Sequence, residues 1–150
     1  MFRSLTAFDD DSLRLAGYAK VALSLFDHWL TEAEFVDCQK LSFDMAVQSG
    51  LRAEYMKEEA RFLDFYRTAF AAGVYCAIGP AMTWFPTWTD DLRGVVVASL
   101  REWRPMDVYC PSLRLRVMGG YDRTDLLLLE RYAPREDILR MIEVSGLFAL

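Results

Sequence analysis

The spacing of apolar residues predicts that the first half of the chain is helical. Behind the acids at 9–11, apolar residues recur at steps of three and four, which predicts one amphipathic helix to about residue 30. Residues 31–34 match a capping box, so a second helix is expected to begin there and to end at Gly50. A third helix is predicted over about 51–72. Its inward-facing residues are expected to be Tyr55, Phe62, Tyr66 and Ala69.

The second half of the chain changes to short apolar runs separated by turns. Residues 74–78 predict a short buried strand, and residues 83–88 predict an extended loop. Thr89 is expected to cap a fourth helix that ends before Pro105. The pattern therefore predicts that a sheet begins in this half, with a helix between its strands.

The last third of the chain predicts most of this sheet. Between 113 and 117, apolar residues alternate with arginines, which predicts a strand with one buried and one solvent-exposed face. The four leucines at 126–129 are apolar on both faces, which is typical of a central strand. The remaining elements are expected to be a strand at 108–110, a turn at 119–122, a helix from Pro134 to Gly146 and an edge strand at 147–150.

Taken together, the patterns predict a single α+β domain spanning residues 1–150. We expect N-terminal helices, followed by a small, mostly antiparallel sheet with two further helices packed on it. The chain has 150 residues, of which 53% are hydrophobic, and this is enough to build one core.

Charge narrows the range of partners. The net charge of −5 repels phosphate backbones, so we expect no nucleic-acid partner, and it favours a basic protein. Residues 68–89 carry no charged side chain and are long enough to cross a bilayer. Because Gly79, Pro80 and Pro86 interrupt a helix there, the sequence predicts no membrane span.

The cysteines point to a reducing compartment. Cys38, Cys76 and Cys110 are odd in number and widely spaced, and the printed chain begins without the apolar run of an export signal. We therefore expect free, buried thiols and a cytoplasmic protein.

No motif predicts a cofactor, a metal site or a catalytic centre. His28 is the single histidine and has no nucleophile at a readable spacing, and the cysteines are too scattered for zinc. Glu58, Glu59 and Asp64 alternate with basic residues, which is typical of a solvated helix face.

The turn at 119–125 supplies secondary site candidates, namely Asp122, Arg123 and Asp125. They follow two glycines whose amides can hold an anion, yet the same residue types are ordinary turn formers. An enzyme with an unrecognised active site would use Asp122 and Asp125 together with His28.

The most unusual segment is 84–91, in which three large aromatic residues precede two acids. Trp84, Phe85, Trp88, Asp90 and Asp91 are the candidates for a partner-binding surface, because rigid aromatic anchors with an acidic rim are typical of interface hot spots. The alternative is that the rings fold back into the core, since burial is the usual fate of aromatic side chains.

In its size, acidity and lack of a catalytic motif, the chain resembles the immunity proteins of bacterial toxin systems. The resemblance is one of composition and assigns no residue a role. It implies a small cytoplasmic inhibitor that holds a toxin tightly, with its acids complementing a basic cleft. Two alternatives stay open: the enzyme just described, and a structural or small-ligand-binding subunit that uses an aromatic pocket.

Overall fold

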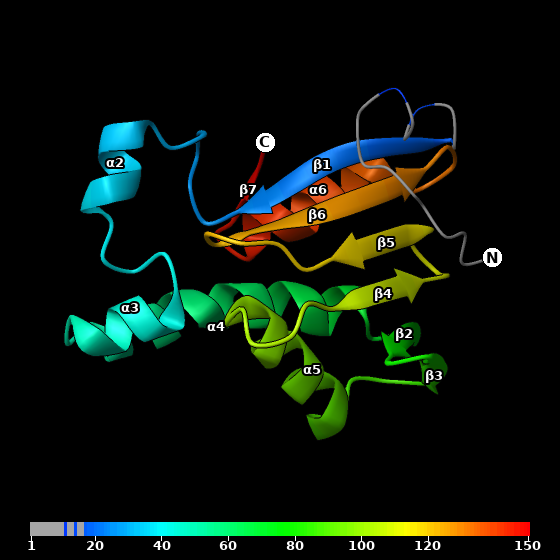
Figure 1. Ribbon diagram of the computed structural model, residues 1–150. Coiled ribbons are helices and arrows are strands. Elements are labelled where there is room, and N and C mark those ends of the chain that lie inside the picture. The colour runs from blue at the N-terminus through cyan, green and yellow to red at the C-terminus, as the bar shows by residue number, and fades with distance from the viewer. Residues whose placement is uncertain (1–10, 12–13, 15–16) are drawn as a thin grey trace.

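A seven-stranded antiparallel sheet organises the molecule (Figure 1). The computed structural model describes residues 11, 14 and 17–150. The strands follow the order β3-β2-β4-β5-β6-β1-β7 across the sheet. In chain order the elements are β1 (Tyr18–Ser24), α2 (Glu32–Asp37), α3 (Phe43–Gln48), α4 (Arg52–Ala69), β2 (Val74–Ile78), β3 (Ala81–Phe85), α5 (Asp90–Leu100), β4 (Asp107–Cys110), β5 (Leu115–Met118), β6 (Thr124–Glu130), α6 (Arg135–Val144) and β7 (Phe148–Ala149).

The predicted arrangement of N-terminal helices followed by a small sheet is wrong. A strand, β1, lies where the first helix was expected, and helices are interspersed among the strands throughout the described residues. The rest of that expected helix, before residue 17, lies largely outside the described residues. The sheet is also larger than predicted, because β1 and β3 join it.

The physical reason for β1 is long-range pairing. Each residue of β1 is matched to one of β6, from Tyr18 opposite Glu130 to Ser24 opposite Thr124. This pairing buries both faces of much of the strand, and such packing outweighs a local helical spacing. The Ala-rich stretch 19–22 fits a period of two as well as one of 3.6, so its periodicity alone does not distinguish strand from helix.

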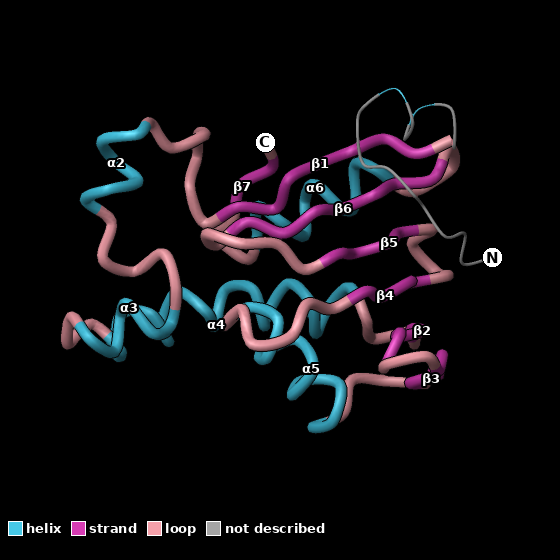
Figure 2. The backbone as a smooth tube through the Cα atoms, viewed as in Figure 1, coloured by secondary structure: helices cyan, strands magenta, loops and turns pink. Residues whose placement is uncertain are grey.

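The second predicted helix is two short helices. The capping box at Thr31 is confirmed, because its hydroxyl accepts from the Glu34 amide while the Glu34 side chain accepts from the Thr31 amide. Cys38 then takes an extended conformation and ends α2, and Ser42 caps α3. Figure 2 shows α2 beyond the end of β1, joined to the rest of the molecule by long loops.

The long third helix is confirmed as α4, and its predicted inner residues are all buried. The predicted strand at 74–78 and the helix capped by Thr89 are present as β2 and α5. The segment 83–88 was expected to be a loop, but its first residues belong to β3, which pairs with β2 through the turn at Gly79 and Pro80.

The predicted solvent-exposed face of the strand at 113–117 is wrong at Arg116, although Ser112 and Arg114 are exposed as expected. The side chain of Arg116 on β5 is buried, and its guanidinium donates two hydrogen bonds to the Asp107 carboxylate on β4. Leu128 and Tyr109 are its neighbours on the adjacent strands, so this face is crowded there. The leucine-rich strand β6 is central, as predicted, and β7 lies at the sheet edge.

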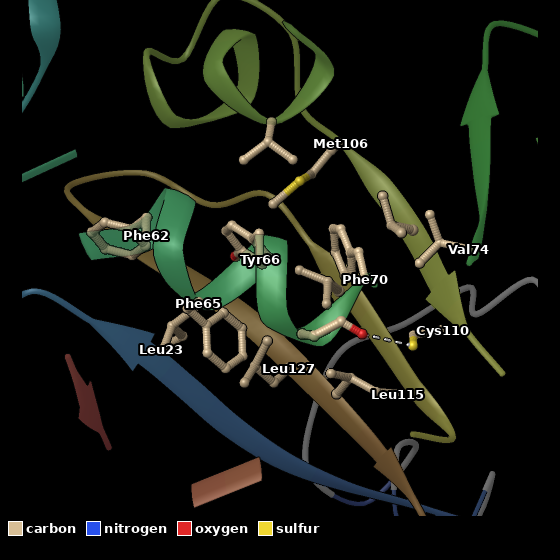
Figure 3. Packing of buried hydrophobic residues seen from close by; sticks show 14 of the residues in the cluster. Leu23, Phe62, Phe65, Tyr66, Phe70, Val74, Met106, Cys110, Leu115 and Leu127 are labelled. Carbon is tan, nitrogen blue, oxygen red and sulfur yellow. Dashed lines mark hydrogen bonds between the residues drawn. The ribbon is translucent and has the colours of Figure 1, made fainter. Parts of the chain in front are cut away.

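One face of the sheet carries the core. Helices α4, α5 and α6 contribute the buried side chains that meet it, and Figure 3 shows the aromatic rings of α4 against the strands. The strand residues in this cluster include Val21, Leu23, Val74, Cys76, Val108, Cys110, Leu115, Val117, Leu127 and Leu129. Since side chains alternate along each strand, the neighbouring residues point to the opposite face.

Candidate functional site

Strand β3 is an exposed edge of the sheet. It pairs with β2 and, within the described part of the chain, with no other strand. Met82 and Trp84 are 46% and 45% exposed, and Trp84 faces Tyr75 of β2 with the ring centres 4.6 Å apart. The indole also covers Gly73, where an added Cβ would lie 2.5 Å from the Trp84 ring. A glycine is therefore required for the ring to occupy this position.

The β3 edge lacks the charges that usually protect such strands. Proteins commonly place lysine or proline on an edge strand to prevent pairing with other chains. The sequence of β3, AMTWF, contains neither, and residues 68–89 around it carry no charge at all. By contrast, β1 near the other edge carries the exposed Lys20, and β7 is only two residues long.

The structure separates the five residues of the predicted partner-binding surface. Trp84 is exposed on the sheet face opposite the helices, whereas Phe85 and Trp88 pack against the core. The Trp88 ring lies 6.3 Å from that of Phe70 at the end of α4. For Phe85 and Trp88, the core alternative considered from the sequence describes their position.

The two acids of that surface begin helix α5, and Asp91 lies near the hairpin of β2 and β3. Asp90 and Asp91 are exposed in the first turn of α5, where negative charge favours the helix dipole. Asp91 lines a surface groove of about 310 Å³ together with Ala77 and Ile78 at the end of β2. Trp84, Asp90 and Asp91 are therefore the exposed members of the predicted set.

The secondary candidates, Asp122, Arg123 and Asp125, point in different directions. Arg123 is 5% exposed and lies 3.9 Å over the Tyr55 ring, donating to the Lys40 carbonyl and to Glu58. Its Nη2 is buried and has no hydrogen-bond partner within the described residues, and burial lowers the pKa of the guanidinium.

The Asp125 carboxylate occupies the position at the glycine turn where an external anion could have bound. Its Oδ1 accepts from the Gly120 amide at 2.9 Å, and its Oδ2 accepts from the Tyr66 hydroxyl. Burial raises the pKa of Asp125. The glycine turn therefore binds a carboxylate of the chain itself, and Asp125 is closed off from any substrate.

His28 is the residue that the structure brings next to Asp122. Both line a pocket of about 170 Å³ between the connection from β1 to α2 and the turn before β6. His28 Nδ1 lies 2.5 Å from Asp27 and Nε2 lies 3.0 Å from Glu34, and these hydrogen bonds raise the pKa of His28. Two of the three residues of the enzyme alternative thus share one pocket, and the third does not.

The aromatic lining of this pocket was not predicted from the sequence. Phe26, Trp29, Phe35 and Tyr121 line it, and they come from the first predicted helix, the second predicted helix and a predicted turn. Nothing in their spacing predicts that they meet, because the pairing of β1 with β6 brings the two segments together.

Helix α4 is less solvated than its charge pattern predicted. Asp64 is exposed and pairs with Arg67, as expected for a solvated face. Glu59, however, is buried and accepts two hydrogen bonds from Arg101 at 2.8 and 2.9 Å. The Arg101 guanidinium also lies 4.2 Å over the Phe43 ring, so this pair joins α4 to the end of α5 and the start of α3.

All three cysteines are free, and Cys76 and Cys110 are buried. Burial raises the pKa of the Cys76 thiol to about 11, so it is protonated at neutral pH. No helix among residues 11, 14 and 17–150 is long and apolar enough to cross a membrane. In the same residues, no three His, Cys, Asp or Glu side chains gather into a group that would hold a metal.

No protein-family model, no curated protein and no solved structure matches this chain.

Proposed function

We propose that this chain is a protein-binding module that holds a protein partner at the edge strand β3. The observation that carries the proposal is an edge strand that is long enough to pair, has no protecting charge and exposes Met82 and Trp84. Such an edge presents a row of backbone N–H and C=O groups to another chain.

The mode of binding that fits this edge is strand addition. An extended segment of the partner pairs with β3 through backbone hydrogen bonds, and alternate side chains supply specificity. The adjacent rings of Trp84 and Tyr75 form a preformed aromatic anchor on one face of the sheet at this edge. Because the Trp84 ring already rests on Gly73 and Tyr75, little of its freedom is lost on binding.

Charge favours a basic partner. Asp90 and Asp91 are exposed in the first turn of α5, Asp91 lines a groove with the end of β2, and the chain as a whole has a net charge of −5. Acids on the same molecule as a binding edge attract a basic partner and speed its encounter. This is the chemistry of an immunity-type inhibitor that neutralises a toxin or effector in the cytoplasm, and free thiols suit that compartment.

The enzyme alternative has less support, because its three residues do not form one site. Asp125 is buried against Tyr66 and Gly120, so only His28 and Asp122 would face a substrate.

The proposal is tested by affinity capture from the native cell with matched variants. Met82→Lys places a charge on the exposed edge of β3, and Val144→Lys places the same charge on the exposed end of α6. We expect a protein that binds the native chain and Val144→Lys to be lost with Met82→Lys and with Trp84→Ala. A partner that all four forms retain equally would contradict binding at β3.

A further inference from the structure

A separate surface pocket lies between the β1–α2 connection and the turn before β6. Its volume of about 170 Å³ suits a group of side-chain size. Trp29 and Tyr121 on its rim are 66% and 68% exposed, so the pocket is open to solvent. A ligand can therefore enter while remaining attached to a larger molecule.

Aromatic side chains are a prominent part of its wall. Phe26, Trp29, Phe35 and Tyr121 all line the pocket. Within the described part of the chain, none of these four rings takes part in an aromatic pair or a cation–π contact. Several aromatic faces around a small space are the usual means of binding an organic cation.

The residues around the pocket are mainly acidic, and their negative charge attracts a cation. Asp122 lines the pocket, and no described residue donates a hydrogen bond to its carboxylate. The wall segment between Lys20 and Lys40 carries the acids Asp27, Glu32, Glu34 and Asp37 but neither lysine nor arginine. His28 is held between two of these acids, which offset its charge when it is protonated.

The neighbouring cation does not fill the site. Arg123 follows Asp122 directly, but its guanidinium is turned to Tyr55 and Glu58. Both Asp122 and Arg123 have positive φ values, of 55° and 61°. The acid is left at the pocket, and the base is buried elsewhere.

We propose that this pocket binds an organic cation, namely the guanidinium or ammonium end of a basic side chain or of a free molecule. The aromatic rings hold the charged head by cation–π attraction, and Asp122 supplies the counter-charge. The site is independent of β3, because its lining residues come from other elements.

The test is a titration of the purified full chain with small probes, followed by calorimetry and by the NMR signals of His28 and Tyr121. The cationic probes are N-acetyl-arginine amide, N-acetyl-lysine amide and tetramethylammonium. N-acetyl-citrulline amide is the neutral match to the arginine probe. We expect at least one cation to bind and citrulline to bind about tenfold more weakly or not at all.

Variants locate the site. Trp29→Ala and Asp122→Asn are expected to weaken cation binding about tenfold or more, whereas the matched controls Trp84→Ala and Asp90→Asn leave it unchanged. Asparagine is well tolerated at positive φ, so Asp122→Asn keeps the turn, and a thermal melt checks this.

Comparing the cationic probes also distinguishes between the two possible sources of the cation. Stronger binding of an amino-acid probe indicates a basic side chain of a protein, and stronger binding of tetramethylammonium indicates a free quaternary ammonium compound. The proposal is overturned if no cation binds at tens of millimolar, if citrulline binds as well as arginine, or if Trp29→Ala and Asp122→Asn bind like the native chain. Met82→Lys should leave this titration unchanged, so failure here is distinct from failure at β3.

Discussion

The hydroxyl of Tyr66 donates a 2.5 Å hydrogen bond to Oδ2 of Asp125, which joins the last turn of α4 to the start of β6. Both side chains are buried. Because Asp125 also accepts from the Gly120 amide, one carboxylate ties the turn before β6 to the helix that covers the sheet. The pocket residues Tyr121 and Asp122 lie in this turn, so their position depends on the same contact.

Removing the hydroxyl should therefore destabilise the fold. Tyr66→Phe leaves a buried acid with one hydrogen bond fewer, and we expect the free energy of unfolding to fall by about 2 kcal/mol in urea titration. Asp125→Asn should lower it less, since an amide can accept from Gly120 and donate to the Tyr66 oxygen. Equal stability of Tyr66→Phe and the native chain would show that the contact has no structural weight.

The two tryptophans of the 84–91 segment should behave differently. Trp88 packs against Phe70 and the core, so Trp88→Ala is expected to lower the free energy of unfolding by about 2–3 kcal/mol. Trp84 is on the exposed face, and Trp84→Ala should lower it by less than about 1 kcal/mol. Thermal and urea unfolding of the two variants measure this, and the reverse order would contradict the placement of the two rings.

Local signals in the sequence predicted the parts of the fold that depend on neighbours in the chain. The capping box at Thr31, the cap at Thr89 and the inner stripe of α4 are set by residues three or four apart, and all three are confirmed. The strand β1 depends instead on pairing with β6, about one hundred residues away, and no local pattern reports such a contact. For this reason the predicted order, with helices first and the sheet after them, was wrong.

The same reasoning explains what was missed in the candidate sites. The exposed Trp84 and the acids after it could be selected from the sequence, because aromatic and acidic residues adjoin there. Whether a ring in this segment faces outward depends on strand alternation in β3, which was predicted as a loop. The aromatic pocket needs β1 and β6 side by side, so its lining could not be assembled from the sequence.

His28 should titrate above its ordinary pKa of 6.5, because its hydrogen bonds to Asp27 and then to Glu34 favour the charged ring. The sign for stability follows: these contacts stabilise the fold fully below pH 6.5, and the contribution is lost as the pH rises through the raised pKa. NMR titration of the ring measures the midpoint. Asp27→Asn and Glu34→Gln should each lower it, and a midpoint at 6.5 in the native chain would refute the arrangement.

The buried pair between Glu59 and Arg101 should matter more than the exposed pair on the same helix. Glu59→Gln leaves the Arg101 guanidinium poorly compensated, and we expect a loss of about 3 kcal/mol in the free energy of unfolding. Asp64→Asn removes an exposed partner of Arg67 and should change it by about 0.5 kcal/mol or less. Urea unfolding of both variants measures these two losses in the free energy of unfolding. Similar losses would mean that Glu59 is solvated in solution.

The most direct test of binding at β3 is hydrogen exchange of the backbone amides in the isolated chain and in its purified complex with the captured partner. If the partner adds a strand, outward-facing amides within Ala81–Phe85 should exchange at least about tenfold more slowly in the complex, because they gain hydrogen bonds. The amides of α6 should exchange at unchanged rates. Unchanged exchange throughout β3, with protection gained elsewhere, would contradict the account.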